Sequence, residues 1–213
     1  MTAGVGDPVP GDAAAGADDR SPQGPLADAV RPDPDASYAR ARAAEPVDAQ
    51  GRAVISTQLG RPARGNPAVV HTCGFGLPTV VRVEPRLEDG TPFPTTFWLT
   101  CPVLRSRVGT LEADQAMVGL NQRLADEPEL AAAYAASDER YRAFRAELGP
   151  TPPGDPGVGG MPHHIKCLHV HAAHHLATGD NPIGAWTVEH ATPAPCPAPC
   201  VTAEGPPAGI PAR

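Results

Sequence analysis

The sequence has few aromatic residues, a single lysine and no long apolar run. Aromatic residues make up 4% of its 213 residues, whereas 28 residues are proline and 22 are glycine. Such a composition indicates that much of the chain lies outside a packed core, and we expect one modest domain. No apolar stretch approaches the ~20 residues of a membrane-spanning helix, and the N-terminal segment lacks the basic and apolar regions of a signal peptide. We therefore expect a cytoplasmic protein that binds no membrane.

Most of the negative charge lies in the first fifty residues. Residues 1–50 carry nine acids and four arginines, and the net charge of the whole chain is −7. The remainder is close to neutral and lacks the basic surface that binds nucleic acid. Residues 1–50 are mainly Ala, Gly, Pro and Asp and have almost no periodic apolar pattern, although residues 37–44 favour a short helix. This predicts a disordered acidic arm, and deletion of residues 1–45 is expected to leave thermal stability unchanged.

Three apolar segments rich in β-branched residues predict strands at residues 67–73, 79–84 and 93–101. The turn sequences GFGLP and EDGTP separate them, so a small antiparallel sheet is expected. Apolar residues then recur at helical spacing over 103–124 and 128–148, which predicts a helix hairpin. A Pro/Gly-rich linker at 149–162 leads to a further helix that Gly179 ends.

These elements predict an α+β fold: a sheet of about three antiparallel strands, a helix hairpin and a C-terminal helix that bears Cys and His. The expected organisation is a disordered arm at 1–50, one domain at 53–190 and a loose Pro-rich tail at 191–213. No internal repeat is found.

The segment KCLHVHAAHHLATGDNPIG, residues 166–184, gathers one cysteine and four histidines on one expected helix. At about 100° per residue, Cys167, His171 and His174 fall within an arc of roughly 60°. His169 lies about 200° from Cys167, which assigns it to the apolar face with local hydrogen bonds rather than to the ligand set. Clustered thiol and imidazole groups are typical of a transition-metal or a nucleophilic site.

Two more cysteines stand where predicted strands end, Cys73 before a glycine turn and Cys101 before Pro102. If the helix packs across this end of the sheet, the cysteines and a histidine suit a Cys3His site for Zn²⁺. The predicted ligands are Cys73, Cys101, Cys167, His171 and His174. The sequence has no Cys-x-x-Cys pair, and free cysteine is often simply buried, so plain packing is the alternative.

We predict a structural zinc ion with four protein ligands in an interaction or regulatory module, which has an unknown protein partner. Three ligands and a water predict a metal-dependent hydrolase for a small or phosphorylated substrate. A thiol enzyme is a further alternative, with Cys167 as nucleophile in the first turn of the helix and His171 as its base. We expect the pair formed by Cys196 and Cys200 to be either incidental or an auxiliary metal-binding or redox pair. Six arginines offer an anion site if they converge: Arg61, Arg64, Arg82, Arg86, Arg105 and Arg107.

Several motifs follow one another in a characteristic order: GRPARG, HTCGFGLPTVV, DGTPFPTTFWLTCP, DEPEL and IKCLHVHAAHHLATGDNPIG. Over residues 58–186 the chain resembles the bacterial, largely actinobacterial domain of unknown function 501 family. The resemblance implies a small cytoplasmic protein without an established activity, encoded near genes that suggest cell division or phosphate metabolism by association only. It assigns no role to the matching positions, which are Cys73, Cys101, Cys167, His169, His171, His174 and Asn181.

Overall fold

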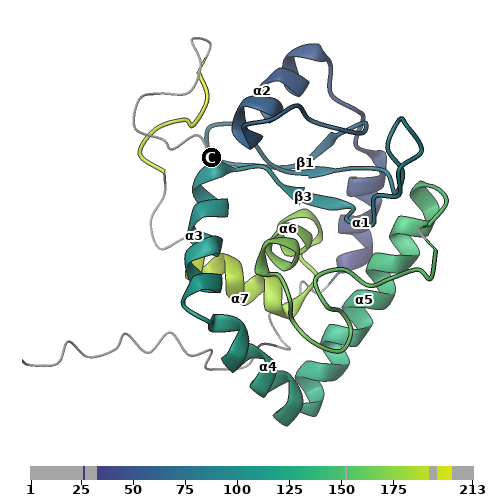
Figure 1. The fold of residues 1–213 in the computed structure, drawn as a ribbon, viewed down its shortest axis with the longest axis vertical. Helices are drawn as coiled ribbons and strands as arrows, with labels where there is room; N and C mark the ends of the chain where they lie inside the picture. The colour runs from purple at the N-terminus through teal and green to yellow at the C-terminus, as the bar shows by residue number, and fades with distance from the viewer. Residues whose placement is uncertain (1–25, 27–32, 152, 192–195, 203–213) are drawn as a thin grey trace, which may run out of the picture.

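The computed structural model describes residues 26, 33–151, 153–191 and 196–202 of the chain (Figure 1). These residues form seven helices and one three-stranded sheet. In chain order the elements are α1 (Pro34–Ala43), α2 (Ala49–Leu59), β1 (Ala68–Thr72), β2 (Pro78–Arg82), β3 (Phe97–Leu99), α3 (Pro102–Ala113), α4 (Ala116–Asp126), α5 (Pro128–Leu148), α6 (Leu168–Thr178) and α7 (Pro182–Ala191).

The sheet is antiparallel with the strand order β1-β2-β3, as the sequence predicted. A tight turn joins the first two strands, in which the Cys73 amide donates to the carbonyl of Leu77 and Gly76 adopts a φ of 72°. Only glycine takes that left-handed backbone without strain. Strand β3 pairs with β2 on one side, with Trp98 opposite Val81. Its other side is an edge of the sheet.

Two apolar clusters lie on opposite faces of the sheet. The larger joins α6 to the sheet, to α3, α5 and α7, and to α1. The smaller packs the α2 residue Ile55 against Val81, Val83 and Leu87. Figure 1 shows α2 on one side of the sheet and α6 on the other. Helix α6 is therefore the central element that positions the Cys and His residues.

The helix expected at 103–124 is two helices. Helix α3 ends at Ala113 with Asp114 as its C-cap, and Gln115 then adopts a φ of 60°, which breaks the helical hydrogen-bond pattern before α4. Helix α5 has the predicted bounds, with Pro128 in its first turn and Gly149 after its last. The linker at 149–162 is held to α5, because the buried Arg145 bonds to Asp155 and to the carbonyl of Pro156.

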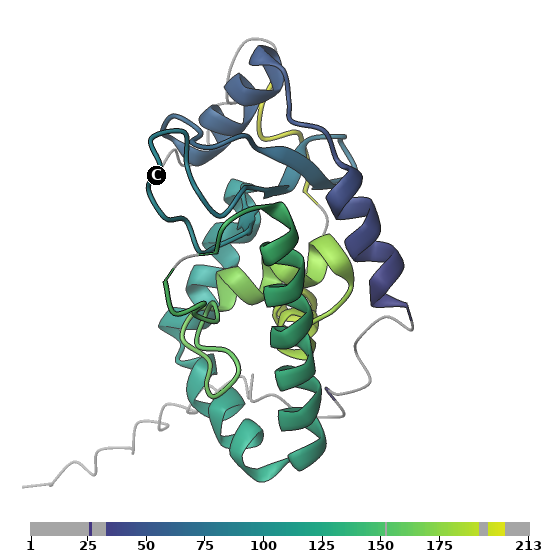
Figure 2. The same ribbon diagram turned by 90° about the vertical axis from the view of Figure 1, so that its right-hand side faces the viewer.

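The N-terminal boundary differs from the prediction. Residues 34–50, which were expected in the disordered arm, form α1 and begin α2. Helix α1 packs on α6 and α5 (Figure 2), and its Tyr38 and Ala41 are buried. The sequence favoured a short helix here, but one tyrosine and one alanine on its buried face are too weak an apolar pattern to predict that it packs in the core. The rest of the predicted arm, apart from residues 26 and 33, lies outside the described residues, as do 192–195 and 203–213 of the tail.

Among the described helices, none combines the length and the apolar character that crossing a lipid bilayer requires.

Candidate functional site

Helix α6 begins directly after Cys167, which is its N-cap and has extended backbone angles (φ −153°, ψ 112°). The first turn of a helix has amide groups without helical partners. Here the Leu168 amide donates to Oε1 of Glu112 on α3, at 2.6 Å. A carboxylate is well placed there, because the N-terminus of a helix favours negative charge.

Glu112, Cys167 and His169 form a group of metal-type ligands at this helix start. One ligand atom from each lies within 4.8 Å of the other two, and all three residues are partly exposed. Within the described ranges no other group of three or more Cys, His, Asp or Glu residues meets this criterion. The arrangement joins α3 to α6 across 55 residues of sequence.

The imidazole of His169 is held at both ring nitrogens. Nδ1 lies 3.1 Å from Oε1 of Glu112, and Nε2 lies 3.0 Å from the carbonyl oxygen of Arg105. Both neighbours are acceptors, so both ring nitrogens donate and the ring is an imidazolium. Burial lowers the pKa of His169, but contacts with Cys167 and Glu112 outweigh it and raise the pKa to about 9.

An open pocket of about 270 Å³ adjoins this group. Cys167 and His169 lie in its wall together with Arg105 of α3. Within the described part of the chain, the Arg105 guanidinium makes no ion pair or hydrogen bond. The rest of the lining is mainly apolar and comes from the segment before β3, from β3 itself and from α6: Thr95, Phe97, Trp98, Leu99 and Val170.

The five predicted ligands are not brought together as one set. Cys73 is half-buried in the β1–β2 turn, and Cys101 is buried as the N-cap of α3, where its thiol accepts from the Leu104 amide at 3.5 Å. Burial raises the pKa of the Cys101 thiol, and the neighbouring Cys200 and Cys196 raise it further. Of the predicted ligands, Cys167 alone belongs to the group with Glu112.

His171 and His174 lie in the core, joined by Asn181. The Asn181 amide nitrogen donates to Nδ1 of His171 at 3.1 Å and to Nδ1 of His174 at 3.2 Å, while its oxygen accepts from the Gly184 amide. Each histidine therefore carries its proton on Nε2, which faces Tyr134 in one case and Tyr38 in the other. Burial lowers the pKa of His171 to about 4 and that of His174 to about 3.

A salt bridge closes this core network. Asp180 accepts two hydrogen bonds from Arg140, at 2.7 and 2.8 Å, and a third from the Tyr38 hydroxyl. Burial alone would raise the pKa of Asp180, but the bonds to Arg140 lower it below its ordinary value. The network is thus a satisfied structural element, in which Asn181 links both buried histidines.

The predicted ligands lie apart for a geometric reason. The 100° rule holds within a helix, but Cys167 precedes the helix with extended angles, so its side chain does not share the face of His171 and His174. His169, which we had left out of the ligand set, is the histidine beside Cys167. Glu112 had no local signal, because it joins the group only through the packing of α3 on α6.

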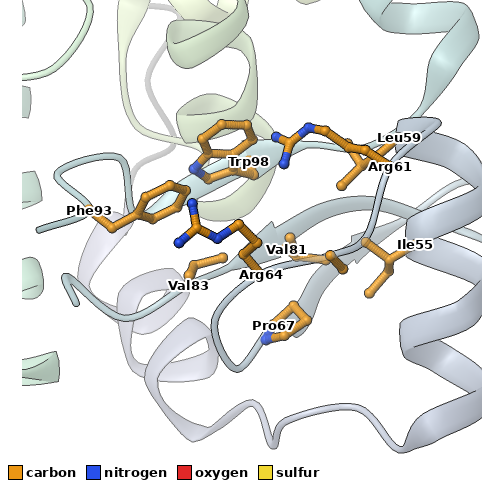
Figure 3. A pocket seen from close by; sticks show the side chains of 10 residues that line it. Ile55, Leu59, Arg61, Arg64, Pro67, Val81, Val83, Phe93 and Trp98 are labelled. Carbon is orange, nitrogen blue, oxygen red and sulfur yellow. The ribbon is translucent and has the colours of Figure 1, made fainter. Parts of the chain in front are cut away.

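A second pocket lies on the opposite face of the sheet (Figure 3). Phe93 and Trp98 stack there with ring centroids 5.1 Å apart, and the Arg61 guanidinium lies 5.4 Å from the Trp98 ring. Arg64 lines the same pocket but pairs with Asp89. The six arginines considered as one anion site are thus separated: Arg61 and Arg64 line this pocket and Arg105 lines the one beside Cys167, whereas the other three line neither.

No curated protein and no solved structure matches this chain. A family model described as "Protein of unknown function (DUF501)" matches residues 69–189, which is more than half of the chain and includes Glu112, Cys167 and His169. This chain belongs to that family.

Proposed function

We propose that Glu112, Cys167 and His169 bind a zinc ion and that this ion hydrolyses a substrate held in the adjoining pocket. The observation that carries the proposal is the gathering of three ligand atoms within 4.8 Å at the wall of a pocket of about 270 Å³. That volume is near the lower end of the range of about 300–1,000 Å³ that is usual for ligand sites.

The donor geometry fits such an ion. Two ligand atoms about 2.0–2.1 Å from a tetrahedral zinc ion lie about 3.3 Å apart, and Nδ1 of His169 is 3.1 Å from Oε1 of Glu112. Zinc would replace the proton between these atoms. The other ring nitrogen would keep its hydrogen bond to the Arg105 carbonyl, which is the usual way in which proteins orient a metal-binding histidine.

The number of ligands favours a catalytic ion over a structural one. Structural zinc sites are closed by four protein ligands, whereas catalytic sites use three and keep one position for water. The group here offers three residues, two of which line the pocket. A zinc ion lowers the pKa of its bound water to about 7. An ion held by these three residues would supply this water as a nucleophile: its oxygen would bond to the substrate's acyl carbon, the bond to the leaving group would break, and the water proton would pass to the leaving group.

Metal analysis of the full-length protein tests the proposal. Protein purified without chelator, or stripped and reloaded with zinc, should hold about one zinc ion per chain. E112Q, C167S and H169Q should each weaken zinc binding at least tenfold, as measured by competition with a chromophoric chelator. C73S removes a half-buried thiol elsewhere and should leave binding unchanged. Failure of the wild-type protein to retain equimolar zinc overturns the proposal.

A cobalt-loaded sample adds a spectroscopic test. Cys167 thiolate bound to Co²⁺ should give a sulfur-to-metal charge-transfer band, and this band should vanish in C167S but persist in C73S. Because the fold does not depend on a closed site, the circular dichroism spectrum should be the same before and after chelation. Unfolding on chelation would instead indicate a structural ion and an interaction module.

A thiol enzyme is the second candidate, because His169 has both Cys167 and the carboxylate of Glu112 as neighbours, and these are the residue types of a nucleophile–histidine–acid arrangement. Its histidine differs from the predicted one, since His171 is bonded in the core. The rate of iodoacetamide alkylation of Cys167 separates the two candidates. Slower alkylation of Cys167 in the presence of equimolar zinc supports the metal site. An alkylation rate that zinc does not change and that falls in H169Q supports the thiol enzyme.

A further inference from the structure

Among the described residues, no strand pairs with the outer edge of β3. On its inner side, the Val83 amide donates to the Thr96 carbonyl and the Thr100 amide donates to the Thr79 carbonyl. Main-chain groups alternate in direction along an antiparallel strand, so those of Leu99 and the carbonyl of Phe97 point to the outer edge. No described residue forms a hydrogen bond with them.

The pocket beside Cys167 lies along the outer edge of β3. Phe97 and Leu99 pack on the α6 face of the sheet, Trp98 packs on the α2 face, and all three line the same pocket. The opposite wall is the start of α6, with Cys167, His169 and Val170. A groove between an edge strand and a helix is the setting in which proteins bind extended peptides by strand addition. Three residues of β3 span about 10 Å, which suits a short peptide.

The charge in this groove selects an anion. Arg105 follows β3 by one turn of α3 and lines the pocket without an ion pair to any described residue. A guanidinium beside apolar side chains binds a carboxylate well, since its planar fork matches the two oxygens. A peptide that runs parallel to β3 brings its C-terminus to the same end of the strand as Arg105. The Arg105 carbonyl in turn touches His169 at 3.0 Å.

From these contacts we infer that the substrate is the C-terminal end of an extended peptide with apolar last residues. It pairs with β3, Arg105 holds its terminal carboxylate, and its last peptide bond lies beside Glu112, Cys167 and His169. Cleavage rests on the proposed zinc site, whereas binding does not. In the cleavage step, water adds its oxygen to the peptide carbonyl carbon, the C–N bond breaks, and the released amino acid's nitrogen takes up the proton.

Binding is tested first, on metal-free full-length protein. The probe is a fluorescent pool of N-acetylated pentapeptides that end in Val-Leu with a free carboxylate, compared with the same pool as C-terminal amides and as backbone N-methylated peptides. The free acids should bind at least tenfold more tightly than the amides or the methylated peptides. R105Q should abolish that preference, while R64Q, which changes an arginine on the other face of the sheet, should keep it. Equal binding of acids and amides overturns the inference.

Cleavage is tested next on zinc-loaded protein, by mass spectrometry of the unlabelled pool. Release of free leucine from the acids without release of leucinamide from the amides supports the inference, and R105Q should lower leucine release more than tenfold without changing zinc content. Peptide binding without zinc binding would leave the peptide groove standing and overturn the zinc site. Zinc binding without carboxylate-dependent peptide binding would support the zinc site and overturn the peptide groove.

Discussion

The hydroxyl of Tyr38 on α1 lies 2.5 Å from Nε2 of His174 on α6, across 136 residues of sequence. The same hydroxyl donates to Asp180 at 3.2 Å. Helix α1 precedes the residues that the family model matches, yet it supplies an acceptor to the buried histidine at the centre of the fold. The folded unit therefore extends N-terminally beyond the matched residues.

Loss of that hydroxyl should destabilise the protein without affecting metal binding. In Y38F, the Nε2 proton of His174 loses its acceptor inside the core, and an unsatisfied buried donor costs about 1–3 kcal/mol. Urea denaturation should show this loss in the free energy of unfolding. Zinc stoichiometry should not change, because Tyr38 does not contact Glu112, Cys167 or His169. Unchanged stability would mean that the Tyr38–His174 contact is not maintained in solution.

Deletion of residues 1–45 should be more damaging than Y38F, contrary to the expectation from the sequence. The deletion removes the buried Tyr38 side chain as well as its hydroxyl, and uncovers part of α6 and Phe144. Burial of one large side chain contributes about 1.5–3 kcal/mol, so the total loss is about 4 kcal/mol. Differential scanning calorimetry should show a Tm lower by roughly 10 °C. A Tm within 2 °C or so of the wild type would restore the original view of this segment as a dispensable arm.

The two roles of Glu112 can be separated by substitution. Its Oε1 accepts from the Leu168 amide at the start of α6, and the same atom lies beside His169. E112Q keeps an oxygen for the amide but loses the charge, so we expect near wild-type stability with weak zinc binding. E112A loses both, and removal of a helix cap should lower the free energy of unfolding by about 0.5–2 kcal/mol. Thermal denaturation and zinc competition on the two variants check this, and equal stability of both would show that the carboxylate does not cap α6.

The link that Asn181 makes between the two core histidines predicts a large effect of its substitution. Asn181 has a left-handed backbone (φ 73°), which glycine adopts freely and alanine does not. N181G therefore isolates the loss of the side-chain amide, and N181A adds about 1 kcal/mol of backbone strain. Both should be less stable than the wild type by more than about 2 kcal/mol, since two histidine nitrogens lose their donor. A neutral N181G variant would contradict the assigned network.

Elements that local interactions specify could be predicted from the sequence, whereas contacts that depend on the packing of distant segments could not. The strands were predictable because β-branched runs between glycine turns specify them, and α5 because Pro128 and Gly149 mark its ends. The break between α3 and α4 at Gln115 could not be predicted, because the residue with the left-handed backbone (φ 60°) is not a glycine. The site was half predictable. Cys167 stood out in sequence, whereas Glu112 and the Arg105 carbonyl reach His169 only through the packing of α3 on α6.

The buried histidines predict how stability depends on pH. His174 is fully buried and its pKa is lowered to about 3 in the folded state, against about 6.5 in an unfolded chain. Above pH 6.5 the imidazole is neutral in both states, and its titration does not change stability. As the pH falls below 6.5, the unfolded chain takes up a proton that the folded chain refuses. The free energy of unfolding then falls by up to about 1.4 kcal/mol per pH unit for each such histidine until the folded pKa is reached.

Urea denaturation at pH values between 7.5 and 5 measures this slope. His171, with a pKa lowered to about 4, acts in the same direction, so the wild-type stability should fall by more than about 2 kcal/mol over that range. H174Q removes one titrating group and should reduce the slope between pH 6.5 and 5 by about half, even if it is less stable at pH 7.5. H163Q, at an exposed position, should leave the slope as it is. A wild-type curve that is flat down to pH 5 would show that the histidines of α6 are open to protons in the folded protein, and the closed core network would then be wrong.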